Sequence, residues 1–236
     1  YETQSEVTEA IRDDVARIVG ERSGGVVLAF LFYPSNYFFT KKPLRKPADI
    51  QGLKVRSHNK ALDDLLRAMG ATADSTIFDS VYQAFESGQL DAAVSCSSCG
   101  ARLAWHEVSG YLVGPIVGLS HSWMAISSRV WEQLPQDIQV IIREEAKRHE
   151  EATRRDSLAA WDQRGVRENV KAGMEHINLT PEIKELMRTA ALSTVLPNWV
   201  RRGGGAASDA VTLFNQKIAP IVKVEITEDG EAREIE

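Results

Sequence analysis

The sequence lacks a long apolar run, a dense block of positive charge and a sizeable set of cysteines. No stretch of about 18 apolar residues occurs, so no segment is predicted to cross a membrane. The 28 Lys and Arg residues are mixed with 33 Asp and Glu residues, for a net charge of -5, without the basic stripe of a nucleic-acid-binding surface. We therefore expect neither a membrane span nor a nucleic-acid partner.

The two cysteines, Cys96 and Cys99, form a CSSC motif. This spacing is compatible with a small disulfide, a redox pair, half of a metal site or two buried small residues. A zinc site needs two further ligands, whereas four of the five histidines, His106, His121, His149 and His176, are scattered. Ser97-Ser98 also lacks the Gly-Pro or Pro-His interior usual in thioredoxin-type motifs. A CxxC-dependent redox or metal-dependent enzyme is therefore the alternative prediction, not the main one.

Recognisable catalytic and cofactor motifs are missing as well. The sequence has no Gly-x-Ser-x-Gly elbow, no phosphate loop and no pair of carboxylates marked by its context. The glycine run 203–205 follows a tryptophan-arginine stretch and not a strand, so it is no dinucleotide fingerprint. The sequence predicts no enzyme, no cofactor and no metal.

Helix and strand patterns alternate along the 236 residues, which suffice for one large domain or two lobes. Three helices are predicted: one over 8–19, one that is capped by Ser57 or Asn59 and ends at Gly70, and one over 79–87. Strands are predicted over 26–32, 53–56, 90–94, 113–116 and 124–127, and Gly118 lies between the last two. The apolar run 26–32 is expected to be covered on both faces. This order predicts an α/β fold of parallel strands wrapped by helices. Two helices separated by Pro197-Asn198-Trp199 and the glycine run 203–205 are predicted to follow, and then a frayed acidic tail over 225–236.

One helix is predicted to be much longer than the others. From Pro135 to about Ala172 the only internal glycine is Gly165, so about 35 residues should form a helix on the order of 50 Å long. Its predicted contact positions lie on either side of a charged middle over 143–155: Ile138, Ile141, Ile142 and Ala146, then Leu158, Trp161 and Val166. A coiled coil is the alternative, but the heptads fail after Ala146. A helix longer than one small lobe is predicted to brace two.

Arg56 ends the short apolar strand Leu53 to Arg56. A guanidinium offers a planar fork of donors that matches a carboxylate, which a lysine cannot copy. Ligands in open α/β sheets gather beyond the carboxyl ends of strands, where Arg56 is expected. It is therefore the main candidate for binding an anion, and a surface or interlobe salt bridge is the alternative.

Three segments together resemble a known family: KPLRKPADIQGLKVRSHN over 42–59, MGATADSTIFDSVYQAFESGQLDA over 69–92 and WEQLPQDIQVIIREEAK over 131–147. They are similar to the solute-binding proteins of tripartite ATP-independent periplasmic (TRAP) transporters. The resemblance implies a two-lobed α/β periplasmic binding protein fold, type II-like, with a long helix bridging both lobes. Residues 1–33 with 118–160 would form lobe I, and residues 34–117 with 161–236 lobe II. It also implies that further units of lobe I precede Tyr1.

The resemblance implies roles for residues near the strand ends. Arg56 would bind the ligand carboxylate, and Phe78 would pack on the ligand, although an aromatic residue at this position is often plain core. Ser95 falls where the family usually places an asparagine that reaches the ligand. A hydroxyl has a shorter reach, so either a water intervenes or the ligand is bulkier there.

Three further residues are candidates from the remaining segments. Asn36 could supply a neutral polar contact or simply belong to a turn. His121 and Trp123 would line the cleft on a strand that crosses between the lobes, or else be buried in the hinge. The expected function is capture of a small organic acid, C4-dicarboxylate-like, in the periplasm and delivery to TRAP membrane subunits. A stand-alone sensor or scavenging module with the same pocket is a further alternative, and the sequence leaves the identity of the acid open.

Overall fold

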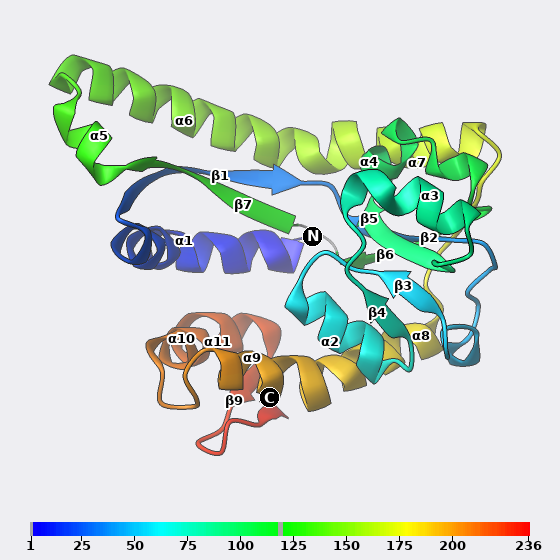
Figure 1. The fold of residues 1–236 in the computed structure, drawn as a ribbon. Coiled ribbons are helices and arrows are strands. Elements are labelled where there is room, and N and C mark those ends of the chain that lie inside the picture. The colour runs from blue at the N-terminus through cyan, green and yellow to red at the C-terminus, as the bar shows by residue number, and fades with distance from the viewer. Residues whose placement is uncertain (1, 118–119) are drawn as a thin grey trace.

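The computed structural model describes residues 2–117 and 120–236, and its largest element is a six-stranded mixed sheet (Figure 1). The strand order is β4-β3-β5-β2-β6-β8. The bounds are β2 (Asn36–Thr40), β3 (Lys54–Arg56), β4 (Thr72–Asp74), β5 (Ala92–Cys96), β6 (Tyr111–Val117) and β8 (Glu175–Ile177). The predicted parallel pairing is confirmed for β3 with β4 and with β5, whereas β2 runs antiparallel to both β5 and β6.

Helices cover both faces of this sheet. The bounds are α2 (Lys60–Ala68), α3 (Val81–Glu86), α4 (Ser97–Arg102) and α8 (Pro181–Ala190), with 3-10 turns over Pro47–Asp49, Phe78–Ser80 and Trp105–Glu107. Side chains alternate between the faces: Phe38 and Val94 join the core under α2 and α8, and their neighbours Phe39 and Ala93 join the core under α3. Asn59 caps α2 by accepting a hydrogen bond from the Leu62 backbone N–H, as predicted.

A second, two-stranded sheet lies beside the first. The strand β1 (Gly25–Tyr33) pairs antiparallel with β7 (Ser120–Ser127), and Figure 1 shows this ribbon between α1 (Glu2–Ser23) and α6 (Gln136–Asp156). Phe30 and Phe32 are buried, but the first half of β1 is only half-buried, so the run 26–32 is not fully covered as predicted. The predicted separator Gly118 lies outside the described residues.

The predicted long helix is confirmed. After the short helix α5 (Ser128–Gln133), α6 continues through a π turn over Ser157–Asp162 into α7 (Gln163–Lys171). Its first part packs against β1 and its last part against α4, so one helical run joins the two sheets (Figure 1). The expected contacts of Ile138 and Ile141 are wrong, because both side chains are exposed. The side chain of Leu158 lies outside the described part of the structure.

The buried anchor of this helix comes instead from its charged middle. Glu150 is 6% exposed and accepts hydrogen bonds from Nε and Nη2 of Arg12 on α1, both at 2.7 Å, and from the backbone N–H of Phe30 at 3.0 Å. Burial acts to raise the pKa of Glu150, but the hydrogen bonds from Arg12 and Phe30 hold it below its usual value. One carboxylate thereby ties α1, β1 and α6 together.

The C-terminal segment is more regular than predicted. The bounds are a π turn over Ala191–Val195, α9 (Leu196–Arg202), α10 (Asp209–Leu213), a π turn over Phe214–Ile218, α11 (Ala219–Val222), β9 (Val224–Ile226) and β10 (Ala232–Glu234). The helix runs through Pro197, since the π turn before it relieves the clash of a proline ring with the preceding turn. The predicted fraying is wrong, because β9 and β10 form a hairpin that buries Ile226 near Phe214.

No helix of the described residues combines the length and the apolar character that a bilayer crossing requires.

Replacing Arg12 with Ala should lower the free energy of unfolding by on the order of 3 kcal/mol, because it leaves Glu150 buried without its bidentate partner. Arg17→Ala is the control on the same helix, since Arg17 pairs with Glu21 at 3.2 Å and both side chains are exposed. That loss should stay below about 1 kcal/mol. Urea denaturation measures both changes, and equal losses would contradict the role given to the buried pair.

Candidate functional site

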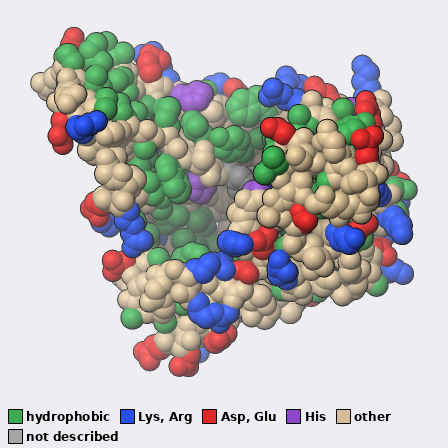
Figure 2. Space-filling view, viewed as in Figure 1, with side chains coloured by type: hydrophobic (Ala, Val, Ile, Leu, Met, Phe, Trp, Pro, Cys, Tyr) green, Lys and Arg blue, Asp and Glu red, His purple; other side chains and the backbone are tan. Residues whose placement is uncertain are grey.

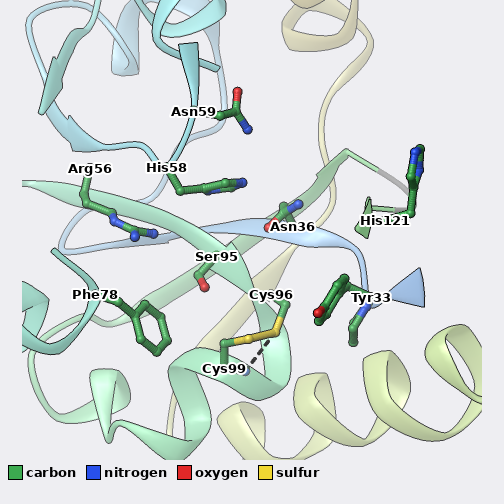
Figure 3. A pocket seen from close by; sticks show the side chains of 11 residues that line it. Tyr33, Asn36, Arg56, His58, Asn59, Phe78, Ser95, Cys96, Cys99 and His121 are labelled. Atoms are coloured by element: carbon green, nitrogen blue, oxygen red, sulfur yellow. Dashed lines mark hydrogen bonds between the residues drawn. A yellow bond between two sulfur atoms is a disulfide. The ribbon is translucent and has the colours of Figure 1, made fainter. Parts of the chain in front are cut away.

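A cavity of about 530 Å³ lies at the carboxyl ends of β3 and β5. Figure 2 shows the molecule hollowed in its middle, between the part formed by α1, β1 and β7 and the part formed by the six-stranded sheet. The lining residues, most of them labelled in Figure 3, are Tyr33, Pro34, Asn36, Arg56, His58, Asn59, Phe78, Ser95, Cys96, Cys99 and His121. Both sheets therefore contribute to this cavity.

Five of the six predicted site residues meet in this lining. Arg56, Phe78 and Ser95 come from the six-stranded sheet and the turn before α3, Asn36 begins β2 and His121 lies on β7. The sixth, Trp123, lies on β7 opposite Phe30 with 47% of its surface exposed, and it is not among the lining residues. Its part in ligand binding stays a prediction.

Arg56 is held inside the protein by backbone oxygens and an aromatic ring. The residue is 8% exposed; its Nε donates to the Thr76 carbonyl at 3.2 Å and its Nη1 to the Val94 carbonyl at 3.1 Å. The guanidinium carbon lies 5.6 Å from the centre of the Phe78 ring. Burial lowers the pKa of Arg56, and no ion pair with a carboxylate of the described residues offsets that burial. A buried cation without a carboxylate partner favours binding of an anion.

The two histidines of the lining do not add fixed positive charge. Burial lowers the pKa of His58, the charge of Arg56 lowers it further, and a hydrogen bond with the Val94 backbone acts in the opposite direction. Burial also lowers the pKa of His121, whose ring lies near Phe30 and Phe32. Both shifts favour the neutral imidazole, and Arg56 provides the permanent positive charge among the described lining residues.

Cys96 and Cys99 form a disulfide that borders the cavity. Cys96 ends β5 and Cys99 lies in α4, so the bridge closes the turn from strand to helix (Figure 3). Of the arrangements compatible with the CSSC spacing, the structure therefore has the small disulfide. Among residues 2–117 and 120–236, no three His, Cys, Asp or Glu side chains lie close enough together to hold a metal ion.

Behind the disulfide, a buried polar cluster joins the site to the long helix. Asp162 accepts hydrogen bonds from the Ser97 hydroxyl at 3.0 Å and the Tyr37 hydroxyl at 3.1 Å, and Asn169 donates to the Ser97 carbonyl at 2.9 Å. Burial raises the pKa of Asp162 although these hydroxyls act to lower it. The cluster fixes α4, and with it one wall of the cavity, to the last turns of the helix.

Sequence reasoning missed His58 and Asn59 in the lining. They directly follow Arg56 at the end of β3, so the rule that ligands gather at strand ends would have included them. Tyr33 and Pro34, just before Asn36 in the sequence, also line the cavity. The Asp162 cluster has no local signal, because Tyr37 and Ser97 lie 125 and 65 residues away from Asp162.

A family model described as bacterial extracellular solute-binding protein, family 7 (DctP) matches residues 4–199. Among curated proteins, the C4-dicarboxylate-binding periplasmic protein DctP of Rhodobacter capsulatus is 27% identical over 139 residues, or 58% of this chain and 42% of the relative. A solute-binding protein of Albidiferax ferrireducens is 24% identical over 133 residues, or 55% of this chain and 39% of the relative. The match thus spans less than half the length of each of these relatives.

Solved structures of TRAP periplasmic and extracytoplasmic solute-binding proteins share the fold. DctP7 of Bordetella pertussis, which binds pyroglutamic acid, superposes with a TM-score of 0.80 at 21% identity, covering 90% of this chain and 69% of that one. A Desulfovibrio salexigens protein with bound orotic acid reaches 0.83 at 21% identity, covering 93% and 71%. A Rhodoferax ferrireducens protein with bound malonate reaches 0.80 at 20% identity, covering 94% and 71%. The predicted two-lobed α/β fold is thereby confirmed.

We expect His58 to titrate below 6.5, its ordinary value, and to move upward when Arg56 is replaced by Met, because the variant removes the nearby positive charge while burial remains. Since a lowered histidine pKa means that the unfolded chain binds more protons, stability should fall as pH drops through about 6.5. NMR titration of the imidazole signals measures the shift. An unchanged His58 pKa in Arg56→Met would show that the two groups do not interact.

Proposed function

Because the chain belongs to the bacterial extracellular solute-binding proteins of family 7, we propose that it captures a small organic acid and delivers it to the membrane subunits of a TRAP transporter. The observation that carries the proposal is the buried Arg56 guanidinium, which lines a cavity and has no carboxylate partner among the described residues. An incoming carboxylate would supply the missing charge and accept paired hydrogen bonds from the planar fork.

The other lining residues would define the shape of the site around that carboxylate. Phe78, which packs beside the guanidinium, would form an apolar wall. Ser95 and Asn36 would offer neutral hydrogen bonds, and His121 would approach from β7. Pyroglutamic acid, orotic acid and malonate, bound by structurally similar proteins, are acids that such a fork could hold, which supports this assignment.

We propose that residues 1–33 with 118–160 and residues 34–117 with 161–236 act as two lobes that close on the ligand. The boundary at residue 118 falls outside the described residues. Tyr33 and His121 belong to the two-stranded sheet, whereas Arg56 and Ser95 belong to the six-stranded sheet. A ligand that contacts both sides binds the closed form more tightly and so shifts the population toward it.

The proposed location is the periplasm, where the membrane subunits of a TRAP carrier would accept the ligand. The match to an extracellular solute-binding family supports an extracytoplasmic site of action. The alternative of a CxxC-dependent enzyme is not favoured by these comparisons, because the matching proteins are solute-binding proteins of transporters. The Cys96–Cys99 disulfide then serves as a wall of the binding cavity.

The probe is pyroglutamate or malonate, whichever binds the unmodified chain. Arg56→Lys and Arg56→Met should each weaken its binding by at least about 100-fold, because charge-assisted hydrogen bonds contribute about 1.5–3 kcal/mol each. Isothermal titration calorimetry measures the change, and far-UV circular dichroism checks that the fold persists. Lysine keeps the charge and loses the fork, so it separates geometry from electrostatics.

Arg67→Met is the matched control, because Arg67 is exposed on α2, lines no part of the cavity and changes the net charge by the same amount. Its affinity should equal that of the unmodified chain. Wild-type affinity in Arg56→Met would refute the role assigned to Arg56.

A further inference from the structure

A second cavity of about 260 Å³ adjoins the one that contains Arg56, on the side of α2. The two share Asn36, His58 and Asn59, so three polar side chains stand where the cavities meet. Figure 3 shows His58 and Asn59 on the side of the site away from the Cys96–Cys99 disulfide, with Asn36 between them and the disulfide. A molecule held at Arg56 can therefore reach the second cavity past His58.

The wall of the second cavity beyond this junction is apolar. It is formed by Leu62 and Leu65 from α2, Val117 from β6 and Val195 from the π turn after α8. Leu65, Val117 and Val195 are only half-buried, so each keeps surface that a guest could cover. Covering such surface with an apolar group is favourable, whereas placing a charged group there would cost its hydration.

The charges of the combined space point the same way. Among the described residues that line the two cavities, Arg56 alone carries a permanent charge. His58 and His121 carry no permanent charge, and desolvation lowers the pKa of each, which favours the neutral imidazole. One carboxylate is therefore matched by a cation, and a second carboxylate on the same ligand would find only neutral partners. A second carboxylate placed in the apolar space would lose hydration without gaining a permanent cation as its partner.

Resting on the proposed function, we infer that the ligand is a monocarboxylate with an apolar chain or ring. Its carboxylate binds Arg56, the polar junction of Asn36, His58 and Asn59 surrounds the atoms next to the carboxylate, and the apolar part enters the space between Leu65 and Val195. This distinguishes the site from one that offers a second permanent cation to a dicarboxylate.

The test is a series of straight-chain monocarboxylates, butanoate through octanoate, titrated by calorimetry beside dicarboxylates of equal carbon number, succinate through suberate. Each added methylene that enters the second cavity should tighten Kd about fourfold, the equivalent of about 0.8 kcal/mol, until the cavity is filled. Each dicarboxylate should bind at least about tenfold more weakly than its monocarboxylate counterpart.

Ala61→Leu provides the matched variant, because Ala61 lines the second cavity from an exposed position on α2, where leucine is well tolerated in a helix. The added side chain should occupy the cavity and flatten the dependence of Kd on chain length. Ala172→Leu is the control: the same substitution at an exposed residue after α7 that lines neither cavity should leave the whole series unchanged.

The outcomes separate the two proposals. If acids bind and Arg56→Met abolishes binding, but Kd is independent of chain length or dicarboxylates bind as well as monocarboxylates, this inference is overturned and the proposed function stands. A chain-length dependence that Ala61→Leu leaves intact also overturns it, since the apolar group would then lie elsewhere. If no acid of either series binds, the proposed function fails and this inference fails with it.

Discussion

The proposed binding site depends on the burial of one guanidinium group. The Arg56 side chain is buried beside a cavity. Its described partners are two backbone carbonyls and the Phe78 ring, and none of these neutralises its charge. Carbonyl dipoles and an aromatic face lower the cost of that burial without removing it. The cavity thus contains a positive charge that the described residues of the protein do not neutralise, and an anionic ligand would neutralise it. The other described lining residues, among them two histidines whose pKa values are lowered, add no permanent charge to that of Arg56.

The rest of the fold holds the groups around Arg56 in place. The long helix is fixed to α1 and β1 by Glu150, and to α4 by the Asp162 cluster, so both walls of the cavity are attached to one rigid element. Both attachments use buried carboxylates that are fully engaged by donors within the protein. Glu150, the buried charge that holds the long helix to α1, is paired with the Arg12 guanidinium, whereas the charge of Arg56 at the cavity has no such partner among the described residues.

Much of this arrangement could be predicted from local patterns. The absence of glycine and proline over 136–164 predicts the long helix, and the position of Arg56 at the end of an apolar strand predicts its place at the sheet edge. The helix contacts could not be predicted, because Glu150 looks like a solvated charge until Arg12, 138 residues away, is placed beside it. Strand β2 was missed since it is short and follows Pro34 closely. The CSSC spacing admits several states, and only the structure, in which the two sulfur atoms are bonded, identifies the disulfide.

The second cavity could not be predicted from the sequence at all, since its walls come from α2, β6 and a π turn far apart along the chain. The most direct test of the central claim is a crystal structure of the chain with a bound organic acid, such as hexanoate or pyroglutamate. The account predicts that both carboxylate oxygens accept hydrogen bonds from the Arg56 guanidinium, with that side chain still inside the cavity. A carboxylate bound away from Arg56, or Arg56 paired with a carboxylate of the protein in the complex, would contradict it.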